Sequence, residues 1–155
     1  MTRRFPALLL LASLALLGPA STLRAQAPEP NKLDAIRQEP DLEKRSELSL
    51  EFARSSVGRV VKAYKDGRPE QAREILASII EAAELSQASL EETGKVARKK
   101  PKHFKKAEIA SRKLLKDLED AQRTMTFEER PDFDPAIRRV DEINRALLLE
   151  IMQRK

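Results

Sequence analysis

The stretch AYKDGRPEQAREILASI, residues 63–79, decides the fold, because it contains the end of one helix and the start of the next. Gly67 supplies the left-handed conformation that commonly ends a helix, and Pro69 presets the backbone angle of a first helical turn. Only Gly67 and Arg68 separate the two predicted helices. A connection this short places two helices side by side and antiparallel. The sequence therefore predicts an αα-hairpin centred on Gly67.

Apolar residues continue from this turn in both directions at helical spacing. One stripe runs through residues 41–66 and a second through residues 69–93, each with a member every three or four residues. The members are Leu50, Ala53, Val57, Val60 and Tyr64, followed by Ala72, Leu76, Ile79, Ala83, Ser86 and Leu90. Two further helices are predicted over residues 101–124 and from residue 134 onward, each with a proline in its first turn. No alternating pattern indicates a β-strand.

Each of the four long helices has one apolar stripe and a charged opposite face, so the stripes must be buried against one another. The connections of about two, seven and ten residues are short enough to make successive helices neighbours. We therefore expect an all-α fold, an antiparallel bundle of about four long helices over residues 41–155. Residues 26–40 are expected to form a linker and a short helix, over 31–38, that packs across one end of the bundle.

The N-terminus has the layout of a secretory signal peptide. Two arginines precede an unbroken run of leucines and small residues over residues 7–17, which a Gly-Pro pair ends. The run is shorter than the ~20 apolar residues that span a bilayer, although an uncleaved membrane anchor stays an alternative. We expect residues 1–25 to be removed by cleavage after Ala25, with Ala27 as the alternative site. The mature protein is then exported, periplasmic or secreted, and soluble.

The hairpin around Gly67 resembles the middle of a tetratricopeptide-type helix pair. In that family a glycine ends the first helix and a small residue follows five positions later, as Gly67 and Ala72 do here, with Leu76 as a subsequent large contact. Tyr64 departs from the family pattern by one position, and no second copy follows at a spacing near ~34 residues. The resemblance implies a helix hairpin and no repeat array. In overall layout the chain also resembles small exported helical proteins of uncharacterised bacterial families, which implies no activity.

The charge is unevenly distributed along the chain. Residues 28–94 carry a net charge of −4, residues 95–116 carry +9, and residues 117–155 carry −3. The expected mature protein is therefore nearly neutral, with one basic segment at 95–116. Such a distribution favours local contact with an anionic partner over the general nucleic-acid affinity of a basic protein.

Little in the sequence points to catalysis, a cofactor or a metal. The chain has no cysteine, which excludes thiol chemistry and disulfides. His103 is the only histidine, and Lys106 and Ala107 occupy the positions three and four residues on, so its own helix gives it no carboxylate there. We expect a surface histidine. Glu81 and Glu84 are expected to belong to a solvated helical face. The sequence predicts no enzyme, no cofactor and no metal site.

The basic segment breaks a rule that the other helices obey. Helix N-termini prefer acidic residues, yet the helix from Pro101 begins among lysines. Unpaired N–H groups together with cations can bind an anion, and the alternative is a solvated turn whose charge is partly offset by nearby Glu91 and Glu92. The candidate anion contacts are Lys95, Arg98, Lys99, Lys100, Lys102, Lys105 and Lys106.

These observations predict a non-enzymatic, exported interaction or structural protein of the cell envelope, whose partner is an unknown protein or envelope component. The alternative is a weak polyanion or membrane-surface binder that uses residues 95–116. Nucleic acid is not expected as a partner, because the segment's one aromatic residue, Phe104, belongs to the apolar stripe and cannot stack on bases. The sequence leaves the oligomeric state open.

Overall fold

The computed structural model describes residues 30–152. Within that range the chain is helical, with no strand. The elements are α1 (Pro30–Arg37), α2 (Leu42–Lys65), α3 (Pro69–Glu92), α4 (Pro101–Arg123), the 3₁₀ helix η1 (Arg130–Phe133) and α5 (Asp134–Met152). The structure confirms the predicted all-α helical bundle with four long helices. The expected signal peptide lies outside the described residues.

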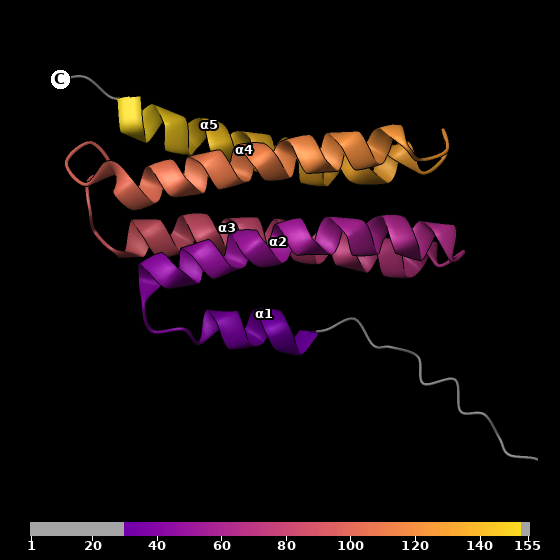
Figure 1. The fold of residues 1–155 in the computed structure, drawn as a ribbon, viewed down its shortest axis with the longest axis horizontal. Helices are drawn as coiled ribbons and strands as arrows, with labels where there is room; N and C mark the ends of the chain where they lie inside the picture. The colour runs from indigo at the N-terminus through magenta and orange to yellow at the C-terminus, as the bar shows by residue number, and fades with distance from the viewer. Residues whose placement is uncertain (1–29, 153–155) are drawn as a thin grey trace, which may run out of the picture.

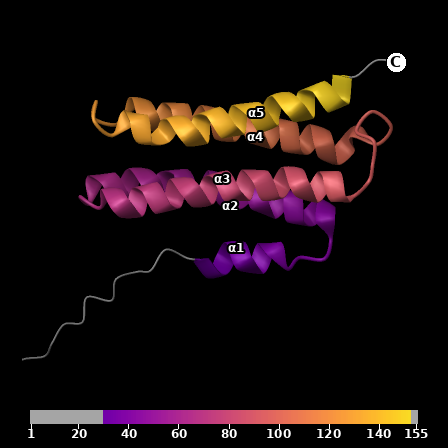
Figure 2. The ribbon, with the colours of Figure 1, turned by 180° about the vertical axis from the view of Figure 1, so that it is seen from behind.

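The four long helices form two stacked hairpins that alternate in direction (Figures 1 and 2). The first hairpin pairs α2 with α3 and the second pairs α4 with α5, and these two pairs make the most extensive contacts. Across the hairpins, α2 packs on α4 and α3 packs on α5. The buried stripes of all four helices therefore meet in a single core. Its fully covered side chains include Leu50, Ile79, Leu114, Leu118 and Leu147.

Helix ends follow local chemistry. Gly67, with a φ of 69°, ends α2, and Pro69 opens α3. Asp41 caps α2, because its side-chain carboxylate accepts hydrogen bonds from the backbone N–H groups of Glu43 and Lys44, both at 3.0 Å. The turn at Gly67 makes α2 and α3 antiparallel, as the hairpin stretch predicted.

Small side chains allow α2 and α3 to pack closely. Ala53, Ala72 and Ala83 are each completely buried. Buried serines add a side-chain hydrogen bond between the two helices, with Ser46 Oγ 2.7 Å from Ser86 Oγ. The distance between packed helix axes depends on the size of the side chains at the contact. The small alanine and serine side chains therefore favour a short distance between the axes of α2 and α3.

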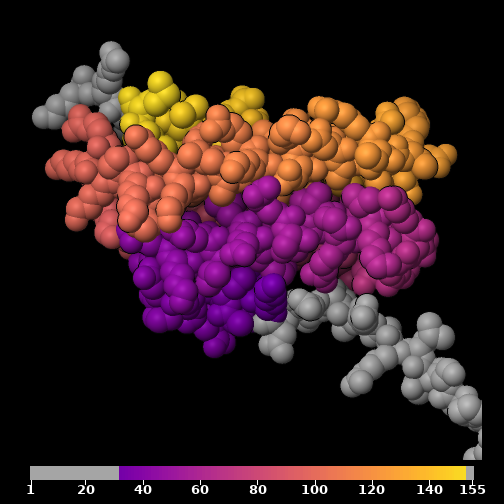
Figure 3. Space-filling view, viewed as in Figure 1, coloured from indigo at the N-terminus to yellow at the C-terminus, as the bar shows by residue number. Residues whose placement is uncertain are grey.

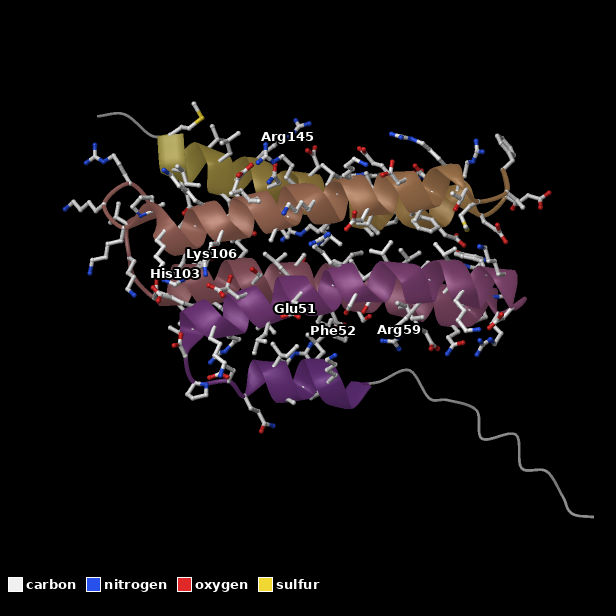
Figure 4. The ribbon with its side chains drawn as sticks, in the orientation of Figure 1. Glu51, Phe52, Arg59, His103, Lys106 and Arg145 are labelled. Atoms are coloured by element: carbon white, nitrogen blue, oxygen red, sulfur yellow. The ribbon has the colours of Figure 1, made fainter. Side chains whose placement is uncertain are left out.

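The short helix α1 lies along the outer side of the α2–α3 hairpin and contacts both of its helices (Figure 1). The expectation that it packs across one end was wrong. Its buried residues Leu33 and Ile36 join the core, and Arg37 Nη2 donates to Glu81 Oε2 in the middle of α3 at 2.8 Å. Figure 4 shows Phe52 on the side of α2 that faces α1, where its ring is only 4 % exposed. A second apolar side on α2 thus explains the position of α1.

The two hairpins are also joined at the end of the bundle that holds the α2–α3 turn. Tyr64 Oη donates to Asp132 Oδ2 at 2.6 Å, and Arg73 Nε donates to the same oxygen at 3.0 Å. The Tyr64 ring stacks on that of Phe133, with ring centroids 6.0 Å apart. Phe133 is completely buried and Tyr64 nearly so. The connection that contains η1 is therefore an integral part of the core.

Candidate functional site

The candidate site is the end of the bundle opposite to η1, which we call the cationic end. It comprises the α3–α4 connection, residues 93–100, the first turns of α4 and α2, and the last turns of α5 (Figures 1 and 2). Figure 3 shows the start of α4 projecting at this end of the molecule, directly above the first turns of α2.

The N-terminus of α4 has neither a side-chain cap nor an acidic residue in its first turn. Gly94, with a φ of 62°, ends the preceding helix, and Pro101 stands at the first position of α4. This differs from α2, whose first N–H groups are capped by Asp41. The partial positive charge of the first turn of α4 is consequently added to that of the surrounding lysines.

Two of the seven predicted contact residues are engaged in ion pairs with α2. Lys95 Nζ donates to Glu43 Oε1, and Lys106 Nζ donates to Glu47 Oε1 at 2.9 Å. The ammonium of Lys95, with His103 close by, lowers the pKa of Glu43 below its ordinary range. These contacts join the first turns of α2 to the α3–α4 connection and to the first turns of α4.

Glu91 and Glu92, which the alternative of a solvated turn placed beside the lysines, make their hydrogen bonds with other residues. Glu92 Oε2 accepts from Arg45 at 3.3 Å, and Glu91 accepts from Gln87 at 2.9 Å. The compensating carboxylates come from α2 because it packs on α4, which the spacing of residues along the chain does not reveal.

The other five predicted residues are exposed cations without an ion pair to any residue within 30–152. They are Arg98, Lys99, Lys100, Lys102 and Lys105. Three of them, Lys100, Lys102 and Lys105, line a shallow hollow of about 490 Å³ whose other walls include Glu43 and Lys95. The structure thus leaves a group of unpaired positive charges at one end of the bundle.

His103 has partners that its own helix does not supply. Its Nε2 lies 3.1 Å from Glu43 Oε2 and its Nδ1 lies 3.4 Å from Glu47 Oε1, with the side chain 25 % exposed. Figure 4 shows His103 and Lys106 on the side of α4 that faces α2. The expected surface histidine is thus partly buried where α4 packs on α2, and the two carboxylates beside it, one helical turn apart, come from α2.

Exposed apolar side chains gather in the same half of the molecule. Among residues 30–152, six large apolar side chains are exposed. Five of these lie in the α3–α4 connection, the first nine residues of α4 or the last turns of α5: Val96, Ile109, Leu148, Leu149 and Met152. Phe127 is the sixth and lies at the opposite end, between α4 and η1. The cationic end therefore combines unpaired positive charge with exposed apolar surface.

A groove of about 560 Å³ lies between α2 and α4 near this end. Leu50, Ala107 and Ala110 line it, and the ion pairs Glu47–Lys106 and Arg54–Asp117 lie along its edges. The carboxylate of Glu51 also lines the groove and makes no ion pair with any described residue.

Comparison of the chain with protein-family models, with curated proteins and with solved structures finds no match. Among residues 30–152, no three His, Asp or Glu side chains are grouped so as to hold a metal ion. None of the helices in that range is long and apolar enough to cross a bilayer.

Proposed function

We propose that this chain is a non-enzymatic interaction protein of the cell envelope, exported by the signal peptide expected at residues 1–25. It acts through surface contact, and the surface concerned is the cationic end. The observation that carries this proposal is the group of five exposed cations, Arg98, Lys99, Lys100, Lys102 and Lys105, which no carboxylate of the described residues neutralises.

The sequence left two kinds of partner open, an unknown protein or envelope component and an anionic polymer or membrane surface. The group of unpaired cations favours the anionic surface. Exposed and flexible lysines that are already paired contribute little to binding, because an ion pair in water is worth about 0–1 kcal/mol. Unpaired cations lose no partner when they meet an anion. Near an anionic surface each contributes about 1 kcal/mol, so five give about 5 kcal/mol and a dissociation constant on the order of 10⁻⁴ M.

The placement of Phe104 argues against nucleic acid as the anion. Its ring is 2 % exposed and belongs to the hydrophobic core. The cationic end therefore has no exposed aromatic ring among residues 93–109 on which a base could stack. A phosphate-bearing or carboxylate-bearing surface without base recognition suits the site better.

The proposal is tested by replacing four unpaired lysines, Lys99, Lys100, Lys102 and Lys105, with glutamine. The wild type is expected to bind soluble polyphosphate at low ionic strength and only feebly near physiological salt, since added salt screens the same Coulomb attraction. The variant is expected to lose most of this binding. Its thermal stability should be unchanged or slightly higher, because four cations leave the N-terminus of α4.

A matched control removes the same charge elsewhere. Four cations outside residues 95–116 make neither an ion pair nor a side-chain hydrogen bond with a described residue and serve for this purpose: Lys32, Arg59, Lys65 and Arg138. Their replacement with glutamine should leave most of the polyphosphate binding intact. If the control variant loses as much binding as the first, only net charge matters and the site does not exist. If the wild type fails to bind even at low ionic strength, the anion-binding function is refuted.

A further inference from the structure

We propose that the anionic partner is a lipid bilayer, and that Val96, Leu149 and Met152 enter its interfacial layer while the neighbouring lysines contact the headgroups. This inference rests on the function proposed above and names its partner. It also assigns the orientation of the bundle, with the cationic end toward the membrane and η1 away from it.

The distribution of exposed apolar side chains carries the inference. Val96 is 55 % exposed, Leu149 is 65 % exposed and Met152 is 64 % exposed, all at the end that holds the unpaired cations. Large apolar side chains that gather on one surface commonly mark a contact with a protein or a membrane. A soluble polyanion offers them no apolar phase, whereas a bilayer places hydrocarbon directly beneath its anionic headgroups.

The elements that carry these side chains are held together at one end. Asn144 of α5 donates to Glu108 O at 2.8 Å and to Ser111 Oγ at 2.9 Å, which fixes the last two turns of α5 beside the first turns of α4. Leu148 and Leu149 follow Asn144 by about one turn, on the half of α5 nearest the start of α4. Of the side chains proposed to enter the bilayer, Leu149 and Met152 thus belong to a packed helix, and Val96 lies in the α3–α4 connection.

The charges of this end are consistent with an anionic surface. Arg112 and Arg145 are paired with Glu108 and Asp141, so they do not add to the unpaired cations. Carboxylates without a cation partner at or near this end are those of Asp41, which caps α2, and of Glu51, Glu91 and Glu150. Lys113, farther along α4, is a further exposed cation without an ion pair to a described residue, so the unpaired cations outnumber these carboxylates.

Single tryptophan reporters test the orientation, because the chain contains no tryptophan. Leu149→Trp places a reporter at the cationic end, and Phe127→Trp places a matched one at the opposite end, where the native side chain is 87 % exposed. Both variants are prepared with the same N-terminus as the wild type and mixed with vesicles of phosphatidylglycerol and phosphatidylcholine. Fluorescence at position 149 should shift to shorter wavelength and that at position 127 should not. Equal shifts at both positions, or none at 149 in protein that sediments with the vesicles, overturn the inference.

A second pair of variants separates bilayer insertion from anion binding. Leu149→Ser combined with Met152→Ser should weaken vesicle binding about tenfold or more, since each CH₂ group removed from the interface lowers affinity. Polyphosphate binding should be unchanged. Phe127→Ser, the control, should alter neither. Circular dichroism checks that each variant stays folded. We expect that it does, because the substituted positions are exposed.

The outcomes distinguish the two proposals. Vesicle binding that persists undiminished in the Leu149 and Met152 variant refutes the insertion of these side chains, and binding of polyphosphate but not of vesicles refutes the membrane contact. Either outcome leaves the anion-binding function standing. In the latter case the apolar surface belongs to a contact with an acidic protein. Failure of the wild type to bind either probe refutes both proposals.

Discussion

The single tyrosine allows the junction between the two hairpins to be tested directly. Tyr64 Oη donates to Asp132 Oδ2 at 2.6 Å, and Arg73 Nε donates to the same oxygen at 3.0 Å. Burial of the phenol, together with its hydrogen bond to Asp132, raises the pKa of Tyr64 well above its ordinary value of 10.0. The folded protein therefore favours the neutral phenol over the charged phenolate.

The sign of the pH dependence follows from that direction. Because the pKa is higher in the folded protein than in the unfolded chain, the stability that Tyr64 contributes is complete below about pH 10 and declines as the pH rises further. Between the pKa of Tyr64 in the unfolded chain and its higher pKa in the folded protein, each pH unit lowers the free energy of unfolding by about 1.4 kcal/mol. At neutral pH, Tyr64→Phe keeps the ring on Phe133 but removes the hydrogen bond to the carboxylate. We expect the substitution to lower the free energy of unfolding by about 1.5 kcal/mol. This value is at the lower end of the range for a hydrogen bond to a charged group, because Arg73 still donates to Asp132 in the variant.

Two measurements check this expectation. Phenolate absorbance reports on Tyr64 alone, since the chain has one tyrosine and no tryptophan, and its midpoint in the folded protein should lie well above that of the urea-unfolded chain. Urea melts of the wild type and of Tyr64→Phe at increasing alkaline pH should show their difference in stability shrinking above about pH 10. The variant controls for the lysines, which titrate in both proteins. A phenolate midpoint equal to that of the unfolded chain would falsify the described burial of Tyr64.

The remaining predictions concern single positions on the helices. Gly58 is exposed in the middle of α2, and a Cβ added there meets nothing within 4 Å. Gly58→Ala should therefore stabilise the protein by about 0.5–1 kcal/mol in urea melts, and a destabilised variant would show that this face of α2 is covered. Burial, with Glu91 nearby, raises the pKa of Glu150 above its ordinary 4.5, so the folded state disfavours its ionised form at neutral pH. Glu150→Gln should raise Tm at neutral pH, and the gain should largely vanish by about pH 4, where both states are protonated. A gain that persists there would contradict the titration of Glu150.

The helices themselves could be predicted from sequence because their signals are local. Predicted ranges of 41–66 and 69–93 correspond to Leu42–Lys65 and Pro69–Glu92 in the structure. Prolines at first turns, glycines at helix ends and the capping Asp41 act within a few residues of one another, so sequence spacing is sufficient to recognise them. The same local chemistry identified the uncapped, lysine-rich start of α4.

The partners of those lysines and of His103 were decided only by the tertiary structure. Periodicity shows which face of a helix is buried but not which other helix covers it. Glu43 and Glu47 lie more than fifty residues before the cations they pair with, and they meet them because α2 packs on α4. For the same reason Tyr64 reaches Asp132, 68 residues away, through a 3₁₀ helix that the sequence left as a plain connection.

The local sequence thus determined where the helices begin and end, which faces are apolar and where the positive charge gathers. The packing of α2 on α4 decided which of the predicted contact residues stay free, because it paired Lys95 and Lys106 with carboxylates and left the other five unpaired. Apolar burial brings helices together without regard to their surface charges, so the pattern of paired and unpaired cations follows from the packing and cannot be read from the order of residues.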